Sequence, residues 1–215
     1  MNIKSIVFDL DGTISDPSIG YLNGINYALK SLNKEIYTNE DYKNYLGTPL
    51  HISFKNHFFK SDSDLVEDAM ILFREYYGEK GKYENVLYDG ILDLLKTLDF
   101  KYDLYILTNK THQFALDIVS YFNLTPYFKG IYGIVPNSND SKVDIAKKLN
   151  ESVFENPSEV LMIGDTIHDI KCANEANWIS CFVSYGFGKE TDLIDAIPNK
   201  IVENVTELKT YLTCA

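Results

Sequence analysis

Arginine is almost absent from this sequence. Of its 20 cationic residues only Arg74 is arginine, which nearly excludes a bidentate guanidinium clamp on an anionic substrate. Any anion must then be held by lysine, backbone amides, hydroxyl groups or a bound metal. Positive charge is scarce altogether, because 31 acidic residues outnumber the 20 basic ones and give a net charge of −11. A chain this acidic offers no basic surface to nucleic acid or anionic lipid, so we expect neither as a partner.

Long apolar runs and paired cysteines are missing as well. No run reaches the roughly 18 uninterrupted apolar residues of a membrane span, so we expect no membrane association. The three cysteines, Cys172, Cys181 and Cys214, form no Cys-x-x-Cys pattern, which predicts free thiols in a reducing compartment, without disulfide or zinc. Asp9 comes too early for a signal peptide. We therefore expect a cytoplasmic protein, as a monomer or a homodimer.

Short apolar runs alternate with amphipathic stretches along most of the 215 residues. Apolar runs rich in β-branched residues predict strands at 3–8, 104–107, 160–163 and 179–183, with a weaker one at 130–135. Helical periodicity predicts helices at about 89–99, 111–122, 141–150 and 167–177. Strands that alternate with helices of this length predict an α/β fold, with a mostly parallel sheet covered on both faces.

The segment 16–82 interrupts this alternation. It has amphipathic helical spacing without a convincing strand, and it predicts helices at 18–32, 39–46, 50–59 and 63–78. We interpret it as a helical domain of residues 16–82 inserted after the first strand of a core domain formed by residues 1–15 and 83–215.

Two carboxylates follow the first predicted strand, in the stretch Asp9-Leu10-Asp11-Gly12-Thr13. Side chains two residues apart on an extended segment point the same way, so Asp9 and Asp11 need a cation or a shared proton to offset their repulsion. The carboxyl ends of parallel strands are also where open α/β sheets bind ligands. Gly12 permits a sharp turn and Thr13 adds a hydroxyl group. The alternative is a strand-ending turn whose acidic residues serve solubility.

Thr108 and Asn109 follow the strand predicted at 104–107 and are expected to open a helix. A hydroxyl, an amide and free backbone N–H groups at a helix N-terminus can cradle a phosphate. The alternative is an ordinary helix N-cap.

Three further charged side chains lie at predicted helix starts or strand ends. Lys142 opens a helix, where the helix dipole disfavours a cation; it either neutralises a carboxylate or phosphate or is a solvated surface lysine. Asp165 follows Gly164 at a strand end, and Asp169 lies four residues later on the same helical face. Carboxylates suit a hard cation such as Mg²⁺.

In this order the motifs resemble those of the haloacid dehalogenase-like superfamily of aspartate-nucleophile phosphatases. The four family motifs are matched by Asp9–Thr13, Thr108–Asn109, Lys142 and Gly164–Asp169. The insert resembles the four-helix C1 cap of the phosphoglycolate phosphatase, 5′-nucleotidase-like and β-phosphoglucomutase branch, whose Gly-x-Pro-Leu element is similar to Leu46–Leu50. The resemblance covers essentially the whole chain and implies a Rossmann-like core with this cap.

The resemblance also implies roles for individual residues. Asp9 would be the nucleophile, Asp11 the general acid and base, and Lys142 the cation that neutralises Asp9 and the phosphate. Mg²⁺ would be held by Asp9, the backbone carbonyl of Asp11 and Asp165. The phosphoryl oxygens would be bound by the side chain of Thr108, the amide of Asn109 and Lys142. The supporting residues would be Gly12, Thr13, Gly164 and Asp169.

The function so implied is Mg²⁺-dependent hydrolysis of a small phosphorylated metabolite through an aspartyl phosphate. Phosphoglycolate is the first expected substrate and a nucleoside monophosphate the second. A phosphomutase of the β-phosphoglucomutase type and a non-catalytic regulatory protein with this fold are the alternatives, although the intact set of acidic residues and lysine disfavours the latter. The candidate residues of the insert for contact with the leaving group are Lys43, Tyr45, His51, Lys55 and Arg74.

Overall fold

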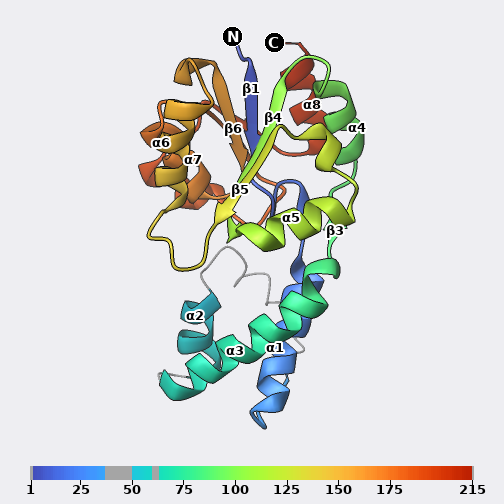
Figure 1. Ribbon diagram of the computed structural model, residues 1–215, viewed down its shortest axis with the longest axis vertical. Helices are drawn as coiled ribbons and strands as arrows, with labels where there is room; N and C mark the ends of the chain where they lie inside the picture. Colours follow the sequence, from blue (N-terminus) through green and yellow to red (C-terminus); the bar gives the residue numbers. More distant parts are fainter. Residues whose placement is uncertain (1, 37–49, 60–62, 215) are drawn as a thin grey trace. The chain divides into compact units, whose positions relative to one another are not determined.

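The chain forms two compact units in the computed structural model, which describes residues 2–36, 50–59 and 63–214 (Figure 1). The first unit comprises Met1–Asp16 and Leu87–Ala215, and the second comprises Pro17–Val86. The chain leaves and re-enters the first unit at β2 (Ser15–Asp16) and β3 (Val86–Leu87), which form a two-stranded sheet.

A parallel six-stranded sheet forms the centre of the first unit, in the order β5-β4-β1-β6-β7-β8. Its strands are β1 (Ser5–Phe8), β4 (Asp103–Thr111), β5 (Gly130–Ile134), β6 (Val160–Gly164), β7 (Ile179–Val183) and β8 (Lys200–Val202). The strands predicted from the apolar runs are all present. Because β1 and β6 lie in the middle of this order, the segments that follow them meet at the centre of one sheet edge.

Helices cover both faces of this sheet (Figure 1). Ile6 and Phe8 of β1 pack with α4, α5 and α8 on one face, whereas Val7 packs with α6 and α7 on the other. This alternation follows from the two-residue period of a strand. The helices are α4 (Ile91–Leu98), α5 (His112–Tyr121), α6 (Lys142–Ser152), α7 (Ile167–Glu175) and α8 (Val205–Thr213). The predicted α/β fold, with helices on both faces of a parallel sheet, is confirmed.

The last two elements of the chain, β8 and α8, were not predicted from the sequence. β8 has only three residues, too few for a clear apolar pattern. The helix α8 begins after Asn204, whose side chain accepts a hydrogen bond from the Glu207 amide at 2.9 Å. That Asn-x-x-Glu spacing is a recognisable helix start. Short 3₁₀ helices complete this unit at Thr125–Tyr127, Pro157–Glu159 and Glu190–Asp195.

The second unit is helical where it is described. It contains α1 (Ser18–Ser31), α2 (Leu50–Ser53), a π-helical turn (Phe54–Phe58), α3 (Ser63–Glu79) and a 3₁₀ turn (Gly81–Tyr83). The helix predicted at 50–59 is thus part α-helix and part π-helix, and the helix predicted at 39–46 lies outside the described residues. No described helix, α3 included, is long and apolar enough to cross a membrane.

Buried aromatic rings hold the second unit together. Phe54, Phe59, Phe73 and Tyr77 are nearly inaccessible to solvent, and the rings of Phe73 and Tyr77 stack with centroids 5.3 Å apart. These rings form the core that a small helical unit needs, so their abundance does not by itself indicate a ligand.

We expect Phe154→Ala to lower the free energy of unfolding by about 3–5 kcal/mol, since it removes a buried ring. The Phe154 ring packs edge-on against Tyr105 and Trp178, at centroid distances of 5.1 and 5.4 Å. Phe100→Ala is the matched control, because Phe100 is 94% exposed. Urea denaturation measures both, and equal losses would contradict the assignment of Phe154 to the core.

Candidate functional site

Acidic side chains gather where the central strands end. Asp9 follows β1 and Asp165 follows β6, and these strands are in register with Phe8 opposite Ile163. The backbone amide of Asp9 donates to the carbonyl of Ile163 at 2.8 Å, which continues the pairing to the strand ends. The first turn of α7 then brings Asp169 back over the same edge.

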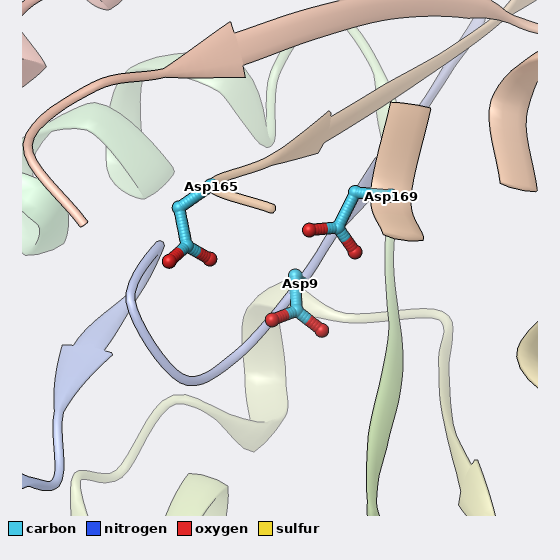
Figure 2. A group of neighbouring side chains, drawn as sticks. All are labelled: Asp9, Asp165 and Asp169. Carbon is cyan, nitrogen blue, oxygen red and sulfur yellow. The ribbon is translucent and has the colours of Figure 1, made fainter. Parts of the chain in front are cut away.

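Asp9, Asp165 and Asp169 form a buried cluster of carboxylates (Figure 2). One oxygen from each lies within 4.8 Å of the others. The three residues are 7%, 0% and 1% exposed, respectively. Carboxylates that approach this closely away from water repel one another unless a cation or a proton lies between them.

Lys142 supplies one such cation. Its Nζ donates to Asp9 Oδ1 at 2.7 Å and also to Asp169 Oδ1, and the residue is only 4% exposed. Lys142 is the first residue of α6, whose start is fixed by a reciprocal capping box between Ser141 and Asp144. Its unfavourable place in the helix dipole is therefore offset by two ion pairs, and it is no solvated surface lysine.

Asp169 is held by the helix that carries it. Its Oδ2 accepts hydrogen bonds from the amide and hydroxyl of Thr166, at 2.9 and 2.8 Å. This capping box at the start of α7 leaves Oδ1 directed at Lys142. Asp169 thus orients Lys142 while it caps a helix.

Burial dominates the electrostatics of the cluster. It raises the pKa of Asp9 to about 6, although the nearby Lys142 ammonium acts in the opposite direction. Burial also raises the pKa of Asp165, with the charges of Asp169 and Asp9 adding to the effect. Burial lowers the pKa of Lys142, but the carboxylates of Asp169 and Asp9 outweigh this and keep it above its ordinary value. The lysine therefore stays charged while two of the carboxylates are destabilised as anions.

A divalent cation fits this donor set. Three carboxylates against the one ammonium of Lys142 leave two negative charges when all are ionised, and this excess adds to burial in raising the pKa values of Asp9 and Asp165. Hard oxygen donors of this kind are the ligands that Mg²⁺ prefers. Asp9 and Asp165 would be its ligands, as the resemblance implies, and Asp169 would stay with Lys142 and Thr166.

The loop after β7 encloses Asp165, and sequence reasoning missed it. The amide of Phe187 donates to Asp165 Oδ2 at 2.8 Å, and the Thr13 hydroxyl donates to Oδ1 at 3.3 Å. A Cβ on Gly188 would lie 1.9 Å from the Asp165 carbonyl oxygen, and one on Gly12 would lie 2.1 Å from Oδ2. Only glycine fits at these approaches, so the Tyr-Gly-Phe-Gly stretch after a buried strand was the available signal.

Asp11 directs its carboxylate away from the acidic cluster. Its Oδ2 forms an ion pair with Lys110 Nζ at 2.6 Å, and no oxygen of Asp11 belongs to the group formed by Asp9, Asp165 and Asp169. Lys110 lies in the stretch after the predicted strand, but nothing in the sequence singled it out.

Thr108 and Asn109 do not open a helix, and that prediction was wrong. The strand β4 continues to Thr111, which pairs with Ile134 of β5, and α5 begins at His112. The tertiary pairing with β5 outweighs the local helix-start signal. Thr108 is 2% exposed at the end of a central strand, whereas Asn109 is exposed. Any phosphate contact here would use the hydroxyl and the backbone, without a helix dipole.

Candidate contacts from the inserted helices fall into two groups. His51, Lys55 and Arg74 are exposed in the second unit. Lys43 and Tyr45 lie outside the described residues, as does most of the Leu46–Leu50 element.

A family model described as "Haloacid dehalogenase-like hydrolase" matches residues 6–183. The chain belongs to this family. Every segment of the acidic cluster lies inside the match, whereas the Tyr185–Gly188 loop lies just beyond its end. The match confirms the family that the order of the motifs predicted.

Individual family members resemble the chain along its full length. A Pseudomonas aeruginosa protein named 5′-nucleotidase is 32% identical, over 99% of this chain and 96% of that protein. A Vibrio parahaemolyticus protein named phosphoglycolate phosphatase is 26% identical, over 96% and 95%. The solved structure of a haloacid dehalogenase-like hydrolase from Streptococcus pneumoniae is 33% identical and superposes with a TM-score of 0.88, over 98% and 99%. The predicted family, fold class and enzyme class are confirmed.

We expect the metal-free protein to lose stability as the pH rises from about 4 to about 6. The folded-state pKa of Asp9, about 6, lies above its ordinary value of 3.8, so the folded state binds the proton more tightly and loses this advantage once Asp9 ionises. Added Mg²⁺ should therefore raise the melting temperature more at pH 7.5 than at pH 5.

Thermal denaturation with and without Mg²⁺ checks this expectation. Asp9→Asn should flatten the pH dependence and weaken the response to Mg²⁺. The control Asp103→Asn, at the opposite end of β4 and exposed, should leave both unchanged. A response to Mg²⁺ that is equal at the two pH values would contradict a metal site at Asp9.

Proposed function

We propose that the chain is a Mg²⁺-dependent phosphatase that hydrolyses a small phosphate monoester through a covalent phosphate on Asp9. The observation that carries the proposal is the Lys142 ammonium, 2.7 Å from Asp9 Oδ1, within a cluster of carboxylates that it neutralises only in part. The negative charge that remains favours the binding of a divalent cation, and the bound cation would in turn attract a phosphate.

Asp9 acts as the nucleophile. Its carboxylate attacks phosphorus and displaces the alcohol oxygen, so one difficult hydrolysis becomes two easier steps. The hydrogen bond that the Asp9 amide donates to the Ile163 carbonyl and the ion pair with Lys142 fix the carboxylate at the end of a central strand. This restriction lowers the entropic part of the barrier.

The residues around Asp9 neutralise the negative charge of the phosphate. A Mg²⁺ ion held by Asp9 and Asp165, with the Asp11 carbonyl, would offset the negative charge that the phosphate brings into an anionic site. Lys142 contributes a fixed positive charge that Asp169 orients. Thr108, buried at the end of β4, offers its hydroxyl to a phosphoryl oxygen, together with the amide of Asn109. With a single arginine in the chain, these groups take the place of a guanidinium clamp.

Asp11 is the general acid and base of the proposed reaction. It donates one to the departing alcohol oxygen, then takes one from the water that attacks phosphorus, which releases phosphate and restores the Asp9 carboxylate. The Asp11 carboxylate lies outside the cluster that would hold the metal and pairs with Lys110 instead.

The names of two relatives indicate which substrate classes to test. One is named 5′-nucleotidase and another phosphoglycolate phosphatase, so nucleoside 5′-monophosphates and phosphoglycolate are the substrates to test first. The second unit, Pro17–Val86, would act as the cap that contacts the alcohol part of the substrate, with His51, Lys55 and Arg74 as candidates.

Asp9→Asn should reduce phosphate release at least about 10³-fold, because the amide is a far weaker nucleophile. Chelation of divalent metal should abolish turnover by the parent enzyme, and Mg²⁺ should restore it. Colorimetric phosphate release measures both effects, and mass spectrometry of acid-quenched protein should detect a phosphoryl adduct on Asp9. Asp103→Asn serves as the control with unchanged turnover; full activity of Asp9→Asn or in excess chelator would contradict the proposal.

A panel of phosphorylated metabolites with Mg²⁺ should identify the substrate. We expect free phosphate from nucleoside 5′-monophosphates or phosphoglycolate, with kcat/KM at least about tenfold above that for the other compounds, since cap contacts separate substrates by a kcal/mol or more. β-Glucose 1-phosphate belongs in the panel. Its conversion to the 6-phosphate without phosphate release would replace the phosphatase by a mutase.

A further inference from the structure

The ion pair between Lys110 and Asp11 is not explained by the acidic cluster. The Lys110 side chain is 3% exposed and lies 2.6 Å from Asp11 Oδ2, whereas the Asp11 side chain is 19% exposed. A buried lysine is costly to desolvate, and the carboxylate that lies within ion-pair distance of Lys110 is that of Asp11. The pair is therefore a separate arrangement at the same sheet edge.

The second oxygen of Asp11 is the informative atom. Asp11 Oδ1 is inaccessible to solvent and has no hydrogen-bond partner within the described part of the chain. A buried acceptor without a donor costs free energy, so native structures keep few of them. Since Oδ1 has no partner there, the ion pair of Oδ2 with Lys110 is the described interaction that fixes the direction of the Asp11 carboxylate.

The backbone around Lys110 is firmly placed. The Lys110 amide donates to Thr108 Oγ1 at 3.2 Å, within the irregular part of β4 between Leu107 and Thr111. A Cβ on Gly133 would lie only 2.6 Å from the Lys110 carbonyl oxygen, so β5 packs closely against this segment. A lysine on such a rigid support can fix the direction of a carboxylate that itself lies on a turn.

We propose that Lys110 is a positioning residue for Asp11: its ion pair with Oδ2 fixes the direction in which this carboxylate faces during catalysis. This inference rests on the proposed function. In the first step the bond from phosphorus to the alcohol oxygen breaks, a bond to Asp9 forms, and the proton on Asp11 moves to that oxygen. In the second step water loses a proton to the Asp11 carboxylate while its oxygen bonds to phosphorus and the Asp9 carboxylate leaves.

Lys110→Met, which preserves length and removes the charge, tests the inference with two substrates of similar shape. Phenyl phosphate needs a proton on its leaving oxygen, whereas p-nitrophenyl phosphate needs it far less. We expect kcat/KM for phenyl phosphate to fall about 10–100-fold, because general acid catalysis is lost with the geometry, and kcat/KM for p-nitrophenyl phosphate to fall less than about threefold.

The second step gives an independent readout. Slower deprotonation of water should lower kcat for both substrates and make the phosphorylated form of Asp9 accumulate in acid-quenched samples. Lys110→Arg, which keeps the ion pair, should restore part of the discrimination between the substrates. Lys171→Met, at an exposed lysine of α7, is the control and should behave as the parent does.

Several outcomes would overturn the inference. An equal fall of kcat/KM for the two substrates, or a rise in KM alone, would make Lys110 a phosphate ligand or a structural residue. Should Lys110→Met not fold, Lys110→Gln is compared in the same way and judged by the same ratio. A parent enzyme that releases phosphate from neither substrate refutes the proposed function itself. An active parent whose Lys110 variants hydrolyse both substrates as the parent does refutes only the positioning role.

Discussion

The Lys142 ammonium is the charge on which the site depends. Each carboxylate removed from water costs several kcal/mol in effective terms, and Asp9 and Asp169 are both nearly inaccessible. Lys142 contacts both, so one cation makes the burial of two anions tolerable. Because Lys142 opens α6 and Asp169 lies in the first turn of α7, the ion pairs also fix two helices on one face of the sheet to the end of β1.

The Lys142 ammonium neutralises only part of the negative charge at this site. Asp165 adds a third buried carboxylate, and burial raises the pKa values of both Asp9 and Asp165. The surrounding structure nevertheless holds Asp165 with the Phe187 amide and with glycines that leave no room for a side chain. A protein selected for stability alone would replace such a group with an apolar residue. Its retention is consistent with stability given up for the proposed function, in which this site holds a cation and a phosphate.

The sequence was most informative where burial and chemistry produce the same pattern. The apolar runs before Asp9 and Asp165 gave both the strands and the acidic residues at their ends. Prediction failed where tertiary contacts decide: Thr108 continues β4 because Thr111 pairs with β5, against a local helix-start signal. Lys110 could not be assigned from sequence either, since its partner Asp11 is 99 residues away in the chain and a strand lysine has no distinctive pattern.

The charges at the sheet edge fall into two separate sets. Lys142 leaves the set of Asp9, Asp165 and Asp169 with an excess of negative charge, whereas Lys110 and Asp11 balance each other. A group that binds a cation must retain negative charge, but a group that passes protons must lose and regain one proton each cycle. Asp11 lies outside the cluster that would hold the metal, and its ion pair with Lys110 fixes the direction of its carboxylate. In the proposed function this separation assigns different chemistry to two aspartates only two residues apart.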